Sequence, residues 1–336
     1  MVSTPATICT RLATTSRPST GIKAIRRPFS SSIANSAAHG ISRCGVVGAG
    51  QMGLGIAYVA AKDAKVEVVL SDASEAALNK GLAFMNKLLE KDVKKSKISS
   101  DDAQAIKDRV KTVNSISAFG QEDVQLVMEA VSESLPLKQK IFSELASQCS
   151  PETILATNTS SISIAKIAAS AVASGSSAEE KAKSSSRVLG IHWMNPVPQM
   201  KLVEIIPCLQ TSPEITARST SFAEACNKQV TTSADTPGFL ANRILMPYIN
   251  EAIVCLETGV GSKEDLDTTA KLGFGHPMGP LTLADFIGLD TCYAIMQTLY
   301  TETADSKYRP SVLLGRMVDA GFLGKKSGKG FFDYSA

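Results

Sequence analysis

Two short apolar segments of the sequence each contain one side chain that could transfer a proton. They span residues 188–194 and 202–206 and are joined by a proline-rich bend. The first holds His192, and the second holds Glu204, a carboxylate whose burial costs free energy unless it has a partner. Histidine changes its charge near neutral pH, so an imidazole paired with a carboxylate suits general base catalysis. The sequence therefore predicts that His192 and Glu204 face each other on neighbouring strands.

A glycine-rich segment indicates what such a base could act with. A strand is expected at 44–47, followed by the G-x-G-x-x-G sequence of residues 48–53, an apolar helix to about residue 61 and a second strand at 66–70. Asp72 comes next, 24 residues after the first glycine. This order of strand, glycines, helix, strand and acid is typical of a dinucleotide-binding unit. The alternative is a glycine-rich turn that only packs a helix on a sheet.

Each part of this segment has a physical task in holding a dinucleotide. Gly48 permits the tight turn, Gly50 lets backbone N–H groups approach the pyrophosphate, and Gly53 allows close packing of helix on strand. The Asp72 carboxylate would accept a hydrogen bond from a ribose 2′-hydroxyl and repel a 2′-phosphate, which favours NAD and leaves tolerance of NADP open. The residues of the loop expected to contact the cofactor are Gly48, Gly50, Gln51, Met52 and Gly53.

The bulk composition excludes several other classes of protein. With 336 residues, 44% of them hydrophobic and 20% charged, the chain can bury a core as one large or two ordinary domains. A net charge of +3 gives no case for nucleic-acid binding, and no apolar run approaches the roughly 20 residues that span a bilayer. The seven cysteines are scattered without a C-x-x-C pair, so no metal site is expected.

The first 40 residues differ in composition from the rest of the chain. Five basic residues and many serines and threonines precede Gly40, whereas the first acidic residue is Asp63. This is typical of a mitochondrial transit peptide, so we expect a protein of the mitochondrial matrix. The alternative is a disordered tail. His39 would be removed with this segment, and folded structure is expected to begin near Ile41.

Strand-like and helix-like segments alternate from residue 41 to residue 235. Such alternation predicts an α/β domain of the Rossmann type with a doubly wound sheet. Two stretches interrupt it, a charged helical arm at 74–109 and a low-complexity loop at 168–186 that is expected to be a solvated, mobile insertion. The lysines of the arm indicate either a solvated face or contact with a phosphate-bearing ligand such as coenzyme A. Further strands are expected at 110–113, 124–129, 153–156, 188–194, 202–206 and 230–233.

Polar side chains follow two of these strands at the edge where open α/β sheets bind ligands. Glu133 and Lys138 come just after the strand at 124–129. Ser160 and Ser161 come after the next strand along the chain. One of these serines is expected to cap the following helix, and the other is expected to be free for a ligand.

From residue 236 to residue 336 the hydrophobic period is that of helices. A smaller all-α domain is therefore expected there, and its amphipathic helices suggest a subunit interface. Asn242 lies in the first turn of its first helix, next to the domain junction. His276 lies in a tight turn and is expected to be structural, which leaves His192 as the candidate base. Helices are expected at 239–258, 263–272, 280–303 and 311–320, and a late strand at 330–334.

Ordered motifs along the chain resemble those of the L-3-hydroxyacyl-CoA dehydrogenase family, and most closely its short-chain branch, the 3-hydroxybutyryl-CoA dehydrogenases. The resemblance runs from about Ser42 to the end of the chain. It rests on the following segments: Gly48–Gly53 with Asp72, Asn158–Ser161, His192-x-x-Asn195-Pro-Val-Pro, Lys201–Glu204, Pro237–Arg243, His276–Pro280 and Gly324–Phe331.

The resemblance implies NAD-dependent, reversible oxidation of an L-3-hydroxyacyl-CoA to the 3-ketoacyl-CoA, by a homodimer joined through the helical domain. It implies that His192 is the general base and that Glu204 is its partner. It also implies that Ser160 and Asn242 hold the oxygens of the substrate. Further cofactor contacts are implied at Glu133, Lys138, Asn195 and Lys326.

Two features depart from the family pattern. Met194 stands where an aromatic residue is usual, which bears on the shape of the acyl pocket. The loop at 168–186 is longer than in the family, and we expect it to add surface without affecting catalysis.

Three other functions are compatible with parts of the pattern. The first is a medium-chain 3-hydroxyacyl-CoA dehydrogenase of fatty-acid β-oxidation. The second is a β-hydroxyacid dehydrogenase acting on free acids, although such enzymes use a catalytic lysine and lack the His-x-x-Asn-Pro sequence. The third is a non-catalytic, structural NAD-binding protein, against which the intact set of proton-handling and substrate-binding residues argues.

Overall fold

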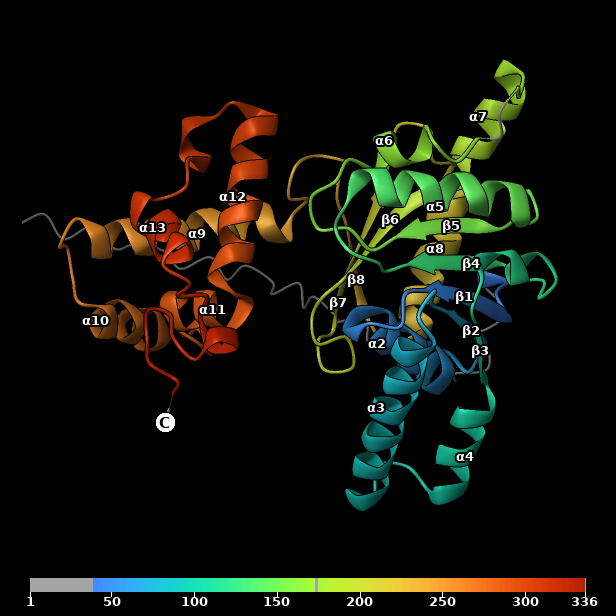
Figure 1. Ribbon diagram of the computed structural model, residues 1–336, viewed down its shortest axis with the longest axis horizontal. Helices are drawn as coiled ribbons and strands as arrows, with labels where there is room; N and C mark the ends of the chain where they lie inside the picture. Colours follow the sequence, from blue (N-terminus) through green and yellow to red (C-terminus); the bar gives the residue numbers. More distant parts are fainter. Residues whose placement is uncertain (1–38, 173–174, 336) are drawn as a thin grey trace, which may run out of the picture. The chain divides into compact units, whose positions relative to one another are not determined.

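The computed structural model describes residues 39–172 and 175–335 (Figure 1). Most of the expected transit peptide, residues 1–38, lies outside the described residues. Within them, an eight-stranded sheet has the strand order β3-β2-β1-β4-β5-β6-β7-β8. All neighbouring strands are parallel except β6 and β7, which are antiparallel. The expected doubly wound α/β fold is confirmed. The strands are β1 Arg43–Val47, β2 Glu67–Ser71, β3 Val110–Val113, β4 Leu126–Glu129, β5 Ile154–Thr157, β6 Val188–Trp193, β7 Leu202–Pro207 and β8 Gln229–Thr232.

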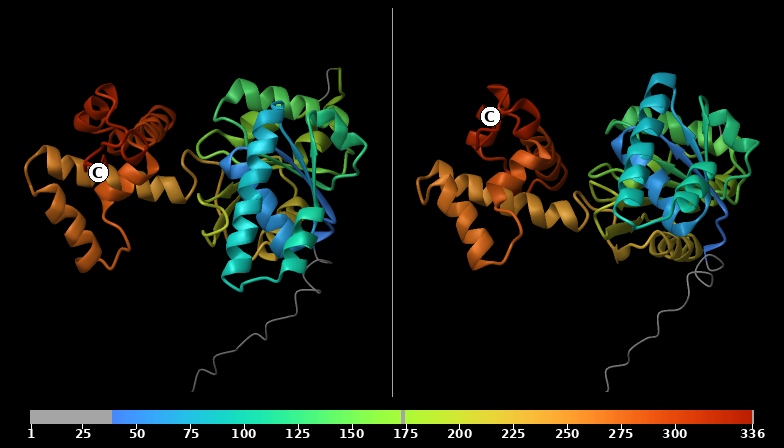
Figure 2. Two further views of the ribbon diagram at one scale, coloured as in Figure 1. Left: turned by 60° about the horizontal axis from the view of Figure 1, so that its bottom comes forward. Right: turned by 90° about the horizontal axis from the view of Figure 1, so that it is seen from below.

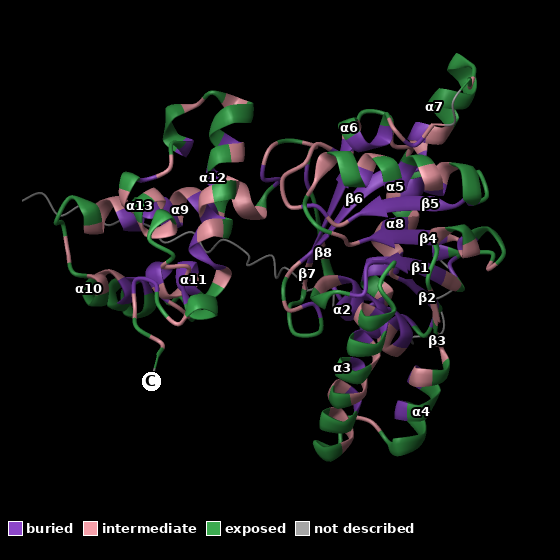
Figure 3. Cartoon of the chain, in the orientation of Figure 1, coloured by how far each residue is buried: buried purple, intermediate pink, exposed green. Residues whose placement is uncertain are grey.

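Helices cover both faces of the sheet. Successive side chains of a strand point to opposite faces, so a strand with consecutive apolar residues needs a covering layer on each side. On one face, Val46 belongs to an apolar cluster with Ile56 and Phe222 from two different helices. On the other face, the next residue, Val47, belongs to a second cluster with Phe142. Figure 3 shows the buried strands between these layers of half-exposed helices. The helices are α2 Gln51–Val59 with its π-helical continuation η1 Ala60–Ala64, α5 Leu135–Gln148, α6 Ile164–Ala168 and α8 Pro213–Ala225.

The charged arm at 74–109 forms a pair of helices that lie side by side (Figures 1 and 2). These are α3, Glu75–Lys94, and α4, Ser100–Asp108. Both interpretations of the arm, a solvated face and a phosphate-binding face, require exposed lysines, so the exposure does not separate them. The exposed lysines are Lys87, Lys91, Lys94, Lys95 and Lys97.

The low-complexity segment at 168–186 is largely exposed, as expected, but it is not a loop throughout. Residues Ala178–Ser186 form helix α7, which begins with a capping box between Ser177 and Glu180. Alanine, glutamate and lysine are good helix formers, yet the helix has no apolar period to mark it in the sequence. The expectation of a loop missed it for that reason.

The C-terminal part is helical and has its own apolar core, which includes Met246, Ile253 and Leu299. The single helix expected at 280–303 is wrong, because the chain breaks at Gly288, whose φ of 105° is a conformation that glycine adopts readily. No helix within residues 39–172 and 175–335 is long and apolar enough to cross a membrane. The helices of this part are α9 Ala241–Glu257, α10 Lys263–Thr268 with its π-helical continuation η3 Thr269–Gly273, α11 Pro280–Ile287, α12 Leu289–Thr303 and α13 Val312–Asp319.

The strand expected at 330–334 is also wrong. The segment makes only isolated bridges among the described residues. The backbone N–H groups of Phe331 and Phe332 each donate to the buried carboxylate of Asp285, at 2.9 Å. This end of the chain is thus held by one side chain of α11 instead of by a strand partner.

The described residues include His39, which lies two residues before the expected start of the folded structure at Ile41. His39 is fully buried, and its ring packs edge-on against Phe222, with 5.9 Å between the ring centroids. Its Nδ1 accepts a hydrogen bond from the N–H of Ile41 at 3.0 Å. Burial, and to a smaller extent the charge of Arg218, lowers the pKa of His39. His39 therefore packs in the described core, although the sequence placed it in the expected targeting segment.

We expect a chain that begins at Ile41 to be less stable than one that begins at His39, by about 1–3 kcal/mol in free energy of unfolding. The shorter chain exposes Phe222 and leaves the N–H of Ile41 without its acceptor. Denaturant unfolding of both chains, each behind the same initiating methionine, measures the difference. The folded state binds a proton on His39 less readily than the unfolded state does. The stability difference between the two chains should therefore be full above the ordinary histidine pKa of 6.5 and shrink as the pH falls below that value. Equal stabilities at pH 7.5 would contradict the prediction.

Candidate active site

The antiparallel pairing of β6 and β7 sets His192 directly opposite Glu204. His192 Nδ1 lies 2.8 Å from Glu204 Oε2, so the predicted hydrogen bond between them is present. The other oxygen, Oε1, accepts from the backbone N–H groups of Leu240 and Ala241 at 3.0 and 2.9 Å. Because Glu204 is an acceptor on both sides, His192 donates from Nδ1, which leaves the lone pair of Nε2 for a proton. The fully buried carboxylate thus orients a base that is itself 6% exposed.

Two further candidate residues lie beside this base. Ser160 Oγ is 3.3 Å from His192 Nε2. Asn242, in the first turn of α9, donates from Nδ2 to the backbone carbonyl of Ser160 at 3.3 Å. The structure therefore brings together three residues that are far apart in the sequence. A hydroxyl beside an imidazole nitrogen suits the binding of an alcohol or ketone oxygen, and the Asn242 amide holds the backbone of the residue that carries the hydroxyl.

Neither Ser160 nor Ser161 caps the following helix, so that expectation is wrong. The N-cap of α6 is Ser163, whose hydroxyl accepts from the N–H of Lys166. The carboxylate of Asp235 accepts the remaining N–H groups at that end, at 2.8 Å each. The sequence does not single out the capping serine, because three consecutive residues, Thr159 to Ser161, carry hydroxyls and Ser163 follows two positions later.

Glu133 holds the segment that contains Ser160. Its Oε1 accepts from the Thr159 hydroxyl at 2.5 Å and from the N–H of Ser160 at 2.9 Å. Asn158, at the start of the same segment, accepts from the N–H of Trp193 at 3.0 Å, which fixes the residue next to the base. The structure thus gives Thr159 and Asn158 positioning roles that sequence analysis did not assign.

Lys138 does not lie where the expected direct cofactor contact requires. It is fully buried, and its Nζ donates to the two carboxylate oxygens of Glu129 at 2.8 and 2.9 Å. Its distance to Glu133 Oε2 is 3.6 Å. With no exposed surface, the Lys138 ammonium can act on a ligand only through Glu133.

The glycine-rich loop has the shape that a pyrophosphate requires. Gly48 has a φ of 102°, and a Cβ there would lie 2.7 Å from the carbonyl oxygen of Ala130. A Cβ on Gly53 would lie 1.9 Å from the carbonyl oxygen of Gly48. Around Gly50, in contrast, the described residues leave open space, and Gly50 precedes a helix α2 without an acid in its first turn. An open helix N-terminus lined by glycine is a binding site for phosphate groups.

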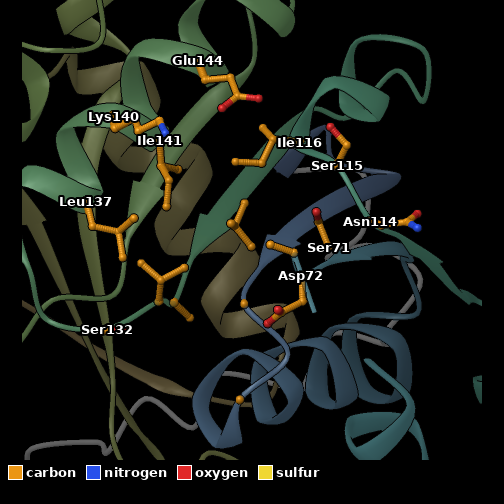
Figure 4. Close-up of a pocket in the computed structure, with 16 residues that line it drawn as sticks. Ser71, Asp72, Asn114, Ser115, Ile116, Ser132, Leu137, Lys140, Ile141 and Glu144 are labelled. Atoms are coloured by element: carbon orange, nitrogen blue, oxygen red, sulfur yellow. The ribbon is translucent and has the colours of Figure 1, made fainter. Parts of the chain in front are cut away.

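Asp72 and a neighbouring cavity continue this loop. Asp72 accepts from the N–H groups of Ala49 and Ser74 at 2.8 and 2.9 Å, which fixes its carboxylate at the end of β2. A cavity of about 560 Å³ opens beside it, within the range of small-molecule sites (Figure 4). Its walls are mostly apolar, as an adenosine moiety needs. Most of its lining has no local signal in the sequence, and this part includes Asn114, Ser115, Ile116, Leu137, Lys140, Ile141 and Glu144.

The two remaining predicted cofactor residues lie in different parts of the fold. Asn195 Oδ1 accepts from Gln51 Nε2 at 3.0 Å, which ties the segment that follows the base to the glycine-rich loop. Lys326 belongs to the helical part, where its Nζ donates to Asp290 at 2.7 Å. The contact of Lys326 with the cofactor stays a prediction.

Alanine substitutions at two glycines of the loop should separate folding from cofactor binding. Gly53→Ala should lower the free energy of unfolding by about 2–4 kcal/mol, because its Cβ meets backbone that must shift. Gly50→Ala should leave stability nearly unchanged, since φ is −69° and the space is open, but weaken NADH binding at least about tenfold by occupying the approach of the pyrophosphate. Thermal unfolding and NADH fluorescence titration measure the two effects. Unchanged binding in Gly50→Ala would show that the pyrophosphate lies elsewhere.

The fold and the site define an NAD-dependent dehydrogenase. A dinucleotide loop and an acid at the end of β2 lie on the same sheet edge as a carboxylate-oriented histidine. A base that removes the hydroxyl proton beside a site for a hydride acceptor is what the oxidation of an alcohol requires.

Comparison with known proteins identifies the family. Residues 43–236 match the NAD-binding domain of 3-hydroxyacyl-CoA dehydrogenases, and residues 238–334 match their C-terminal domain. A 3-hydroxybutyryl-CoA dehydrogenase of Bradyrhizobium diazoefficiens is 46% identical over 294 residues, which are 88% of this chain and 96% of that protein. A probable 3-hydroxybutyryl-CoA dehydrogenase of Bacillus subtilis is 45% identical over 289 residues, 86% of this chain and 96% of that protein. The crystal structure of (S)-3-hydroxybutyryl-CoA dehydrogenase from Ralstonia eutropha is similar with a TM-score of 0.81 and 42% identity, covering 88% of this chain and 100% of that one.

The chain therefore belongs to the 3-hydroxyacyl-CoA dehydrogenase family, and its cofactor is NAD. The resemblance noted in the sequence is confirmed at the level of the family.

Proposed function

We propose that the protein catalyses the reversible, NAD-dependent oxidation of short-chain L-3-hydroxyacyl-CoA thioesters, with 3-hydroxybutyryl-CoA and acetoacetyl-CoA as its substrate pair. The observation that carries this proposal is the position of His192 Nε2, which lies 3.3 Å from Ser160 Oγ on a ring that Glu204 orients through Nδ1. The short chain length of the substrate is supported by the names of two relatives, a 3-hydroxybutyryl-CoA dehydrogenase and a probable one. This chain matches both of them over nearly their full length.

The reaction assigns a separate task to each residue of the site. His192 accepts the proton of the C3 hydroxyl at Nε2 as the C3–H bond breaks. Glu204 keeps the ring in the required tautomer and stabilises the imidazolium that forms. Ser160 and Asn242 orient the substrate oxygen, so that C3–H faces the cofactor site. Bound NAD supplies the acceptor for the hydride.

A series of acyl-CoA substrates tests this proposal. We expect kcat/KM with NADH to be highest for acetoacetyl-CoA and to fall as the 3-ketoacyl chain lengthens to ten carbons. A maximum at medium chain length would favour the β-oxidation enzyme instead. Turnover of free acetoacetate at a similar rate would favour a dehydrogenase of free acids. NADH binding without oxidation by any acyl-CoA would favour a non-catalytic protein.

We also propose that the protein is a homodimer joined through its helical part. Several large apolar side chains of that part are exposed, more than isolated surface residues require. Sedimentation equilibrium of the full chain tests this, and a monomer at micromolar concentration would overturn it. The exposed residues include Leu240, Ile244, Val260, Leu272 and Phe274, with exposed fractions between 41% and 82%.

The mitochondrial matrix stays our proposal for the location of the protein. It rests on the basic, acid-free composition of the first residues of the chain. A fluorescent reporter carrying residues 1–38 should accumulate in mitochondria, whereas a diffuse cytosolic signal would contradict the proposal. Ending the fusion at residue 38 keeps His39 with the folded core.

A further inference from the structure

A buried ion pair lies directly behind the exposed carboxylate of Glu133. Its members, Glu129 at the end of β4 and Lys138 of α5, are fully buried. Besides the two hydrogen bonds from Lys138, the Glu129 carboxylate accepts from the N–H of Val131 at 2.7 Å and from the Thr157 hydroxyl at 2.6 Å. A buried pair of charges adds little stability compared with apolar side chains of the same size. Stability alone therefore does not account for it.

Lys138 stands between two carboxylates but contacts them unequally. Its Nζ is within hydrogen-bond distance of both oxygens of Glu129, at 2.8 and 2.9 Å, and 3.6 Å from the nearer oxygen of Glu133. The side chain of Glu133 is 39% exposed, whereas the other two are enclosed. Two carboxylates and one ammonium carry a net charge of −1. The geometry places the uncompensated negative charge on Glu133, at the rim of the site.

The fold determines which half of a dinucleotide lies near this charge. The cavity beside Asp72 extends from the ends of β2 and β3 to the segment that follows β4, whereas His192 lies farther along the sheet, in β6. Glu133 is on the side of His192, because its carboxylate holds the N–H of Ser160, whose hydroxyl lies beside the histidine. A dinucleotide extends across this switch point, so its nicotinamide half belongs on the side of the base. The oxidised nicotinamide ring carries a positive charge, and the reduced ring is neutral. A fixed negative charge at the rim therefore favours the oxidised form.

We propose that Glu129 is a positioning residue that holds the Lys138 ammonium away from Glu133 and so keeps the rim of the nicotinamide site anionic. This inference rests on the proposed function, because it takes this edge to be the nicotinamide site. If a neutral side chain replaces Glu129, Lys138 has Glu133 as its only carboxylate partner in the cluster. The net charge of the cluster then rises from −1 to 0. The attraction for NAD⁺ then falls, while NADH is little affected.

The ratio of the dissociation constants for NAD⁺ and NADH tests this proposal without relying on turnover. NADH fluorescence gives one constant, and displacement of NADH by NAD⁺ gives the other. In Glu129→Gln the ratio should rise by roughly tenfold, because one unit of charge is lost near the ring. In the double variant Glu129→Gln, Lys138→Met the net charge is again −1, so the ratio should return to within about threefold of the wild type. A role limited to packing would not produce this reversal.

Thr157→Val is the matched control, because it removes a hydrogen bond from Glu129 without changing any charge, and its ratio should equal that of the wild type. Equal weakening of both cofactor forms in Glu129→Gln would overturn the proposal. If that variant does not unfold cooperatively, Glu133→Gln replaces it, since it also brings the cluster to zero charge, and an unchanged ratio there would overturn the proposal too. If the wild type binds neither form, the proposed function fails, which is a different result from an unchanged ratio.

Discussion

Replacing His192 with alanine is expected to lower kcat by about 10²–10⁴-fold, the usual contribution of a general base. The described part of the chain offers no second imidazole at the site, because His39 lies in the core against Phe222 and His276 bonds to Tyr248 in the helical part. Without Nε2, the hydroxyl proton must leave to water. NADH binding should stay within about twofold of the wild type, since His192 is not part of the glycine-rich loop.

The measurement is steady-state turnover of acetoacetyl-CoA with NADH, together with an NADH titration of the same preparation. His276→Gln serves as the matched histidine control and should keep wild-type kcat. His192→Gln should be as inactive as His192→Ala, because an amide can bond to Glu204 but cannot take up the proton. Turnover near the wild-type value in either His192 variant would remove this residue from the mechanism.

The parts of the fold that the sequence predicted are those with strong local signals. The strand, glycines, helix, strand and acid of residues 44–72 specify their own structure through backbone space and periodicity. The pair of His192 and Glu204 was predictable because a charged residue in an apolar strand needs a partner, and few titratable groups were available nearby. Both inferences depend on short-range patterns and on burial, which a sequence shows directly.

The features that the sequence did not predict depend on long-range contacts. The residues next to Glu129 in the sequence do not indicate its role. That role depends on the buried side chain of Lys138, nine residues later, which donates a hydrogen bond to it. The break at Gly288 falls inside an unbroken helical period, and the final segment is held by Asp285, 46 residues before Phe331. His39 was assigned by composition to the targeting segment, although it packs against Phe222. In each case the competing tertiary contact outweighs the local pattern.

The cavity beside Asp72 was missed for a related reason. Its lining comes from the ends of three strands, from the segment at 114–116 and from one side of α5. These side chains are ordinary in type, and only the parallel order of the strands brings them together. The sequence could predict that an acid at the end of β2 meets a ribose, but not which residues enclose the ring next to it.

Replacing Glu204 with glutamine is expected to reduce kcat by about 10²–10⁴-fold, although the side chain keeps its shape. The fully buried carboxylate accepts from His192 on one side and from the N–H groups of Leu240 and Ala241 on the other. A glutamine has only one carbonyl oxygen, so its NH₂ group must face one of these donors. If it faces His192, the ring changes tautomer and Nε2 carries the proton, which removes the lone pair that the reaction needs.

If the NH₂ group faces α9 instead, two backbone donors lose their acceptor, and the free energy of unfolding should fall by about 1–3 kcal/mol. Measuring kcat, the unfolding midpoint and NADH binding on one preparation therefore separates the two orientations. Glu257→Gln is the matched control, because that carboxylate of α9 bonds to the Ser311 hydroxyl within the helical part and should leave kcat unchanged. Wild-type values of both kcat and stability in Glu204→Gln would show that the carboxylate neither orients the base nor holds the start of α9, and the assignment of Glu204 would fall.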